Sequence, residues 1–301
     1  MATLLEVVQQ AQQELSLPVT NAVAGNVDPD TRQMLGLVNR LGKTLTSEFS
    51  WRKLTLTQQY ITVSVDGVMV SASANSAAVT MPDTSLIQEG MSVQNEAFSV
   101  DTYVVSIDSP TQATFSQLAS DAGAFDTLFV QTKYPLPSDF QHQINMTHWD
   151  RNNHWQVLGP VTPQQWEYLH AGIIVVGPRL FYRLLGTDFQ IFPLPAQSTS
   201  RIVFEYITKN WVLGIDGVGK ASCTLDTDDI IFSDNMFVLG LKAFYKQAKG
   251  LDYSGDYQLY LSELGKAKAQ DQGAPIIRLN GPRGNMQFIN WGNIPETGYG
   301  R

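Results

Sequence analysis

Helical patterns at both ends of the chain enclose a middle that is rich in strand-like patterns. Residues 3–16 and the segment after Asp28-Pro29 each carry apolar side chains at helical spacing. Pro18 closes the first segment, and the second is expected to end near Trp51. The apolar stripes consist of Leu4, Leu5, Val8, Ala11 and Leu15 in the first segment and of Met34, Val38, Leu41, Leu45 and Phe49 in the second. Gly36 and Gly42 inside the second helix would permit a close neighbouring helix.

Two more helical patterns lie near the C-terminal end. One starts at Ser233-Asp234 and has Gly250 where a C′ glycine belongs, and the other runs from about Gly255 to Gln270. Their stripes contain Phe237, Leu241, Phe244, Tyr245 and Ala248 in the first and Tyr257, Tyr260, Leu261 and Leu264 in the second. Because apolar stripes must be buried, helices from the two ends are expected to pack together although they are distant in sequence.

Residues 57–133 follow a period of two instead. Short apolar runs alternate there with Gly, Pro and Asn, which predicts a small antiparallel β module. The expected strands are Val63–Val65, Ala78–Met81, Met91–Val93, Tyr103–Ile107, Ala113–Phe115 and Leu128–Val130. This segment contains one lysine and eight carboxylates, so it holds nearly all of the net charge of −8. We interpret it as an insertion within a larger domain.

Residues 134–274 combine β-rich segments with the C-terminal helices. The clearest strands are Phe181–Leu185, Phe189–Phe192 and Ile202–Ile207, and Thr162 with Pro163 predicts one or two helical turns. The sequence thus predicts an α+β fold. Its four parts are an N-terminal helix pair of the core (1–56), the inserted β module (57–133), a β-rich part with the C-terminal helix pair of the core (134–274) and an extended C-terminal tail (275–301).

Composition excludes several classes of protein. The single cysteine, Cys223, rules out a disulfide framework within one chain and a multi-cysteine metal cluster. No apolar run approaches the roughly 20 residues of a membrane span, and the N-terminus lacks the pattern of a signal peptide. No long segment carries the basic stripe that grips nucleic acid, so specific DNA binding is not expected.

The segment from Tyr134 to Trp166 is dense in Trp, Pro and amide side chains. It lacks the grouping of nucleophile, base and carboxylate that catalysis needs. Such residues favour shape and contact surface, because large rings offer much contact area at little entropic cost. The segment therefore indicates a structural protein.

Gly214–Ala221 matches a phosphate-binding P-loop except that Ala221 replaces the hydroxyl residue that would hold Mg²⁺. A P-loop also needs a helix directly after Lys220, and the residues that follow have no helical period. A glycine-rich hairpin is the preferred interpretation. An enzyme that uses this loop, or an unrecognised glycosidase, stays as an alternative.

Other candidate sites also have simple structural interpretations. His142, His148 and His154 recur at intervals of six but are expected to be ordinary surface or hydrogen-bonded histidines. Carboxylates before the third long helix, at Asp226, Asp228, Asp229 and Asp234, would complement the helix N-terminus. Cys223 is expected to be a small packed residue. The aromatic group of Trp149, Trp155, Trp166 and Tyr168 would form either a core or interface or a sugar-binding platform.

Several motifs, taken in order, carry a resemblance to one family. They are Phe49-Ser-Trp51, Tyr134–Phe140, Trp149-Asp-Arg151 with Trp155, Gly159–Trp166, Phe204-Glu-Tyr206 with Trp211, and Ala248–Tyr253. In this order and composition the chain resembles the head-to-tail adaptor proteins of short-tailed bacteriophages, also described as tail tubular or connector ring proteins.

The resemblance implies a four-helix bundle, made of the N- and C-terminal helices, beside a β-rich domain. It also implies a homo-oligomeric ring, expected to be dodecameric, that binds below the portal protein and carries the tail nozzle or fibre proteins. DNA would pass through the channel as non-specific cargo, without membrane contact, cofactor, metal or catalysis. The protein would be located in the neck of the virion, and in the host cytoplasm during assembly.

The resemblance further implies that the tail, Pro275–Arg301, docks on the portal. Phe288, Trp291, Arg278 and Arg283 are then the expected docking residues. The alternative function is a carbohydrate-binding tail component that contacts the host surface.

Overall fold

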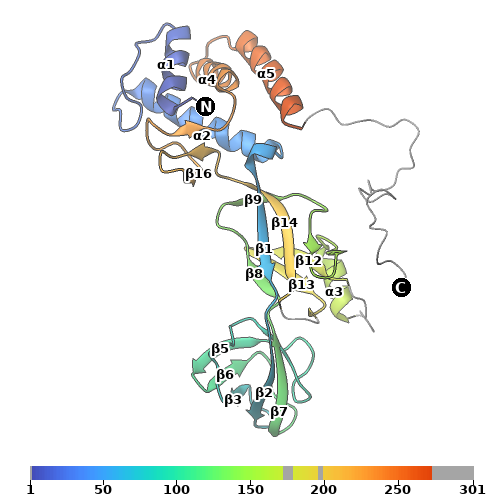
Figure 1. Ribbon diagram of the computed structural model, residues 1–301. Coiled ribbons are helices and arrows are strands. Elements are labelled where there is room, and N and C mark those ends of the chain that lie inside the picture. Colours follow the sequence, from blue (N-terminus) through green and yellow to red (C-terminus); the bar gives the residue numbers. More distant parts are fainter. Residues whose placement is uncertain (1, 172–178, 196–198, 273–301) are drawn as a thin grey trace, which may run out of the picture.

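The structure, a computed structural model, describes residues 2–171, 179–195 and 199–272. These residues form three parts in a row, which we call the helical lobe, the central part and the barrel (Figure 1). Helices and strands are mixed and the sheets are antiparallel, so the fold is α+β.

The helical lobe contains helices from both ends of the chain. They are α1 (Leu4–Glu14), α2 (Pro29–Glu48), α4 (Asp234–Ala248) and α5 (Ser254–Gln272). Helix α4 lies at the centre of the lobe and contacts the other three. A small sheet of β15 (Val212–Leu213), β16 (Gly219–Lys220) and β17 (Asp229–Ile230) completes the lobe.

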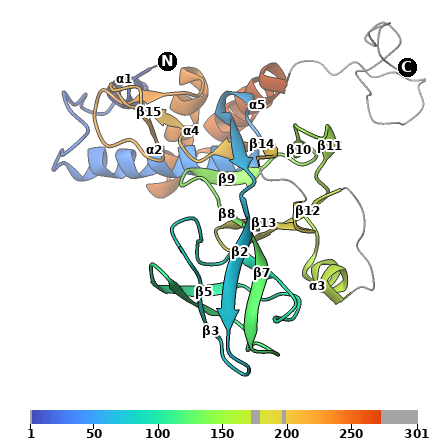
Figure 2. The same ribbon diagram turned by 60° about the horizontal axis from the view of Figure 1, so that its bottom comes forward.

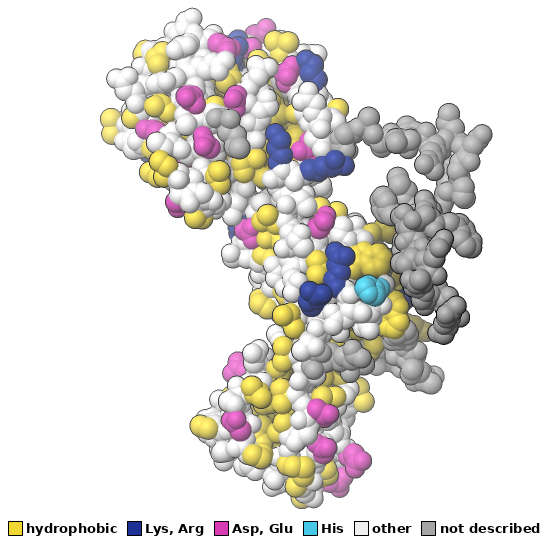
Figure 3. Space-filling view, in the orientation of Figure 1, with side chains coloured by type: hydrophobic (Ala, Val, Ile, Leu, Met, Phe, Trp, Pro, Cys, Tyr) yellow, Lys and Arg dark blue, Asp and Glu magenta, His cyan; other side chains and the backbone are white. Residues whose placement is uncertain are grey.

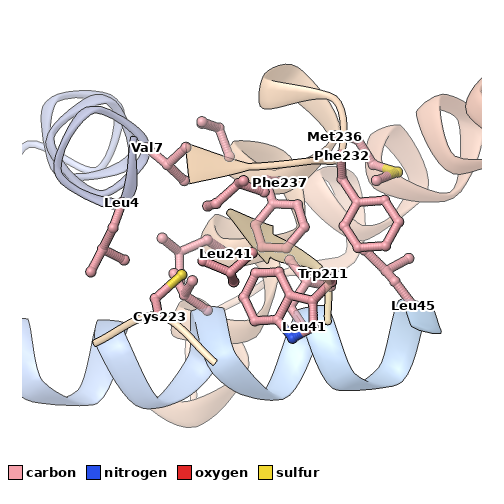
Figure 4. Packing of buried hydrophobic residues seen from close by; sticks show 14 of the residues in the cluster. Leu4, Val7, Leu41, Leu45, Trp211, Cys223, Phe232, Met236, Phe237 and Leu241 are labelled. Atoms are coloured by element: carbon pink, nitrogen blue, oxygen red, sulfur yellow. The ribbon is translucent and has the colours of Figure 1, made fainter. Parts of the chain in front are cut away.

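One hydrophobic core joins these elements. Leu4 of α1, Leu41 of α2 and Phe237 of α4 are buried in the same cluster as Trp211, whose indole ring lies near the centre of the close-up in Figure 4. The apolar stripes of the two chain ends therefore do meet, as the burial argument predicted. Trp211 and the small sheet lie among the helices, so the core is not formed by helices alone.

Local sequence signals explain the helix ends. Thr3 caps α1 through a capping box with Glu6, and Asp28 caps α2 by accepting a hydrogen bond from the N–H of Thr31. Gly250 has a φ of +72° after α4, where its N–H donates to Gln247 and the N–H of Leu251 donates to Lys246. This is the Schellman arrangement that the C′ glycine predicted.

The central part contains two antiparallel sheets. In the first, β14 (Arg201–Thr208) pairs with β1 (Thr55–Ile61) on one side and with β9 (Phe140–Gln143) and β10 (Trp149–Asp150) on the other, and β11 (Trp155–Gln156) extends it. The second consists of β8 (Lys133–Pro135), β12 (Phe181–Leu185) and β13 (Asp188–Phe192). The short helix η1 (Arg52–Leu54) precedes β1 and contacts α5, and α3 (Pro163–Ala171) precedes β12.

The barrel contains β2 (Ser64–Ala72), β3 (Ala78–Thr80), β4 (Ser92–Gln94), β5 (Val104–Ser109), β6 (Gln112–Phe115) and β7 (Gly123–Val130). Its strands follow the order β4-β7-β2-β3-β6-β5. The first and last strands also meet, because the N–H of Val104 donates to the carbonyl of Met91 at 2.9 Å and Ser92 bridges Tyr103. Closure leaves no long free sheet edge.

Two chain segments join the barrel to the central part, and both views show them side by side (Figures 1 and 2). Strand β1 leads into β2, and β7 leads into β8. All seven residues of β1 pair with β14, so residues 55–61 belong to the central sheet and the barrel strands begin at Ser64.

Candidate functional site

The barrel has a strongly acidic surface. Its strands and loops, from Ser64 to Val130, contain no lysine or arginine. They contain eight carboxylates, all exposed: Asp66, Asp83, Glu89, Glu96, Asp101, Asp108, Asp121 and Asp126. On the face shown in Figure 3 the charged side chains of the barrel are acidic, whereas acidic and basic side chains are mixed on the central part and the helical lobe. In the described residues, the one ion pair of a barrel carboxylate joins Asp101 to His170 at 3.8 Å.

A second feature is the β10–β11 hairpin at the edge of the central sheet (Figure 2). Trp149 and Trp155 of this hairpin are 40% and 39% exposed. The pairing places Trp149 opposite Gln156 and Trp155 opposite Asp150, so the indoles project from opposite faces of the hairpin. Buried Asp150 holds the connecting loop by accepting hydrogen bonds from the backbone of Asn152 and Asn153.

A cleft of about 1160 Å³ lies between the barrel and α3. On its central wall the guanidinium of Arg183 covers the ring of Trp166 at 4.1 Å, and His170 packs on Phe192 with ring centroids 4.2 Å apart. Trp166 is 6% exposed. A sugar platform needs an open ring face, so Trp166 is unsuited to that role, whereas Trp149 and Trp155 are accessible.

The P-loop-like segment is a hairpin, as its context predicted. Strands β15 and β16 pair directly, and the N–H of Gly214 donates to the carbonyl of Val218 at 2.9 Å. The ammonium of Lys220 donates to the buried carboxylate of Asp228 at 2.8 Å. This lysine therefore has a structural partner, and no helix follows it directly.

The three regularly spaced histidines have different surroundings. The Nε2 atom of His142 lies 3.0 Å from the hydroxyl of Ser50, and His154 is exposed. His148 contradicts our expectation, because it is fully buried and neither ring nitrogen has a hydrogen-bond partner. Its ring is instead stacked between Tyr182 and Phe204, at centroid distances of 4.0 and 4.8 Å. Burial lowers the pKa of His148 to about 4.

The acidic group before α4 links the N-terminal segment to the C-terminal half. Asp226 accepts hydrogen bonds from the N–H groups of Val23 and Ala24, and Asp234 accepts from the N–H of Ala2. Burial opposes ionisation of Asp228, but Lys220 and two backbone N–H groups outweigh it and lower the pKa of Asp228. In the described part of the chain, no group of three or more His, Cys, Asp or Glu residues could hold a metal ion.

Cys223 is buried in the core of the helical lobe, and burial raises the pKa of its thiol to about 12. The predicted packing role fits this position. Among the described residues, no helix is both long and apolar enough to cross a membrane. The expected docking residues Arg278, Arg283, Phe288 and Trp291 lie outside the described residues.

A protein-family model described as SU10 adaptor protein matches residues 113–279. The chain belongs to this adaptor family. It is thus a bacteriophage structural adaptor and a component of the virion. The matched region starts in β6 of the barrel and includes the central part from β8 onward and helices α4 and α5. A search of curated proteins found no match.

One close pair of residues was not predicted from the sequence. Arg151 and Arg201 are 50 positions apart, yet the N–H of Arg151 donates to the carbonyl of Arg201 at 2.8 Å. Neither arginine belongs to a charge run, and their proximity depends on the pairing of β10 with β14. No local sequence signal could have predicted it.

Proposed function

We propose that the protein is the head-to-tail adaptor of a short-tailed phage, without enzymatic activity. It would form a ring below the portal, continue the DNA conduit and carry the tail nozzle. Membership of the adaptor family carries this proposal. The resemblance to head-to-tail adaptors adds the ring, its expected twelve-fold symmetry and assembly in the host cytoplasm.

The helical lobe supports a role as the structural wall of the ring, built on the four helices α1, α2, α4 and α5. Helix α5 is the last described element before residues 273–301, so the tail starts from this lobe. A tail that starts there could reach the portal while the rest of the fold remains unchanged.

The charge distribution supports passage of DNA through the ring. The chain has a net charge of −8 and no long basic segment, so phosphates would meet few cations that retard them. DNA would be cargo, held by no specific contact.

Electron microscopy of the full-length chain mixed with purified portal tests the proposal. We expect a ring of density on one face of the portal and co-elution of the two proteins. Absence of association at any protein ratio would contradict it.

A chain that ends at Gln272 tests the tail-docking idea. This truncation removes Arg278, Arg283, Phe288 and Trp291 and should abolish portal binding while thermal unfolding stays as in the full-length chain. A full-length variant with Phe288→Ala and Trp291→Ala tests the two aromatic residues alone and should weaken portal binding to a smaller extent. Undiminished binding of the truncated chain would overturn tail docking alone.

The exposed indoles of Trp149 and Trp155 keep carbohydrate binding as a second candidate. Binding to a glycan array that is lost in Trp155→Ala, together with a location at the tail tip and not at the collar, would favour it.

A further inference from the structure

Exposed aromatic and basic side chains lie on and beside the β10–β11 hairpin. Trp149, Arg151 and Trp155 belong to the hairpin, with the two indoles on opposite faces, and Arg201 lies beside it on β14. All four side chains are exposed. In the described residues neither Arg151 nor Arg201 forms an ion pair, so two guanidinium groups are left for a partner.

We propose that this hairpin binds the acidic barrel of a neighbouring copy of the same chain. The proposal rests on the proposed function, because it names the side-by-side contact from which the ring would be built. Trp and Arg are the residue types that most often dominate binding energy at protein interfaces.

Charge complementarity selects the barrel as the occupant. The barrel carries eight exposed carboxylates and no lysine or arginine, whereas the remainder of the chain is neutral overall. A basic, aromatic hairpin and an acidic barrel attract each other at medium range, which steers association and penalises wrong pairings.

The same chain does not satisfy this attraction. In the described residues no barrel carboxylate lies within 4.0 Å of Arg151 or Arg201, although Arg201 pairs with Ile61 close to the junction with the barrel.

The geometry of the contact suits a ring. The hairpin and the barrel are different surfaces, so each copy would use its hairpin on one neighbour and its barrel on the other. Contacts of this heterologous kind form closed rings when the rotation between copies permits it.

Charge reversal provides the first test. Arg151→Glu with Arg201→Glu should weaken self-association, measured by sedimentation velocity with and without portal, by roughly tenfold or more. The control variant, Lys53→Glu with Lys209→Glu, reverses two exposed cations outside the four helices and the hairpin and should assemble as the wild type does. Equal thermal unfolding of both variants would show that the fold is intact.

Rescue makes the test specific. Glu89→Lys, Glu96→Lys and Asp126→Lys reverse three exposed barrel carboxylates and should also weaken assembly. Combined with Arg151→Glu and Arg201→Glu in one chain, they should restore it, because a negative hairpin would then meet a positive barrel. Failure of the combination to improve on either parent would count against direct contact.

Cross-linking locates the contact. Arg151→Lys with Arg201→Lys keeps the charges and supplies amines for a zero-length carbodiimide, and mixing ¹⁴N- and ¹⁵N-labelled chains identifies links between copies. We expect intermolecular links from these lysines to peptides of residues 64–130. Copies that assemble without such links, or a double-glutamate variant that assembles normally, would overturn the proposal. Self-association through these links without portal binding would overturn only the proposed adaptor role, and absence of all self-association would overturn both.

Discussion

Gly42 of α2 lies directly against the indole ring of Trp211. A Cβ atom at residue 42 would be 2.2 Å from Cε2 of this ring, far inside van der Waals contact. Trp211 is fully buried, so it has little space to move aside. We therefore expect Gly42→Ala to lower the free energy of unfolding by about 1–3 kcal/mol, the usual cost of overpacking a core. Urea titration followed by tryptophan fluorescence measures this change.

Gly36 provides the matched control for Gly42. It lies in the same helix, and no atom is within 4 Å of a Cβ built on it. Because alanine favours helix more than glycine does, Gly36→Ala should raise the free energy of unfolding by about 0.5–1 kcal/mol. Opposite signs for the two substitutions are the expected result, and equal effects would show that packing against Trp211 is not the cause.

His148 should make the central part sensitive to acid. Its folded-state pKa of about 4 is lower than the ordinary value of 6.5, so the unfolded chain binds the proton more tightly. Above pH 6.5 His148 is neutral in both the folded and the unfolded chain, so its titration does not affect stability there. Stability should be lost as the pH falls from 6.5 to 4. This group accounts for a loss of about 3 kcal/mol across that window.

His148→Phe tests the acid sensitivity because it keeps an aromatic ring between Tyr182 and Phe204 and removes the titrating group. The slope of unfolding free energy against pH between 6.5 and 4 should become smaller. The control is His154→Asn, at an exposed position with a φ of +56° that asparagine tolerates, and it should leave the slope unchanged. A variant at residue 148 that keeps the full wild-type slope would contradict the assignment.

Asp228 should be more important for stability than its neighbours in the acidic group. Its buried carboxylate accepts hydrogen bonds from Lys220 and from the N–H groups of Thr224 and Leu225. Asp228→Asn removes the charge and leaves Lys220 unpaired, which should lower the free energy of unfolding by about 2–3 kcal/mol. Asp229→Asn, next in sequence, should change it by less than about 0.5 kcal/mol.

Lys220 should be a structural residue and not a nucleotide ligand. If the lysine is structural, Lys220→Met should lower the melting temperature, and ATP with Mg²⁺ should not raise the melting temperature of the wild type. Nucleotide-dependent stabilisation that disappears in Lys220→Met would favour the enzyme alternative.

The sequence predicted the parts of the fold that depend on local signals. Capping by Thr3 and Asp28 and termination at Gly250 are encoded within a few residues, and the apolar stripes identify the buried faces. Other features depend on distant neighbours. Glycine at residue 42 would permit a close neighbouring helix, but the group that lies against it is the indole of Trp211, which is 169 positions away in sequence.

For the candidate surfaces, too, local features could be predicted from the sequence and contacts between distant residues could not. The acidic character of the barrel was visible in its composition, because a lack of lysine and arginine needs no structure to be counted. The proximity of Arg151 to Arg201 and the aromatic stack around His148 both require the pairing of β10 with β14. Spacing alone could not separate a buried histidine from a surface one.

Lys242 should contribute to the contact between helices from opposite ends of the chain. Its ammonium lies 2.7 Å from the carboxylate of Glu14 in α1 and 3.3 Å from that of Asp256 in α5, and its side chain is 13% exposed. Lys266 pairs with Glu263 within α5 and is 62% exposed, so it is the matched surface control. Partial burial reduces screening by water, whereas exposed pairs contribute little. Lys242→Met should therefore lower the free energy of unfolding by about 1–2 kcal/mol, and Lys266→Met by less than about 0.5 kcal/mol. Urea unfolding of both variants at low salt measures the difference, and equal losses would mean that the pairing of Lys242 with Glu14 and Asp256 adds nothing to the contact between the two ends of the chain.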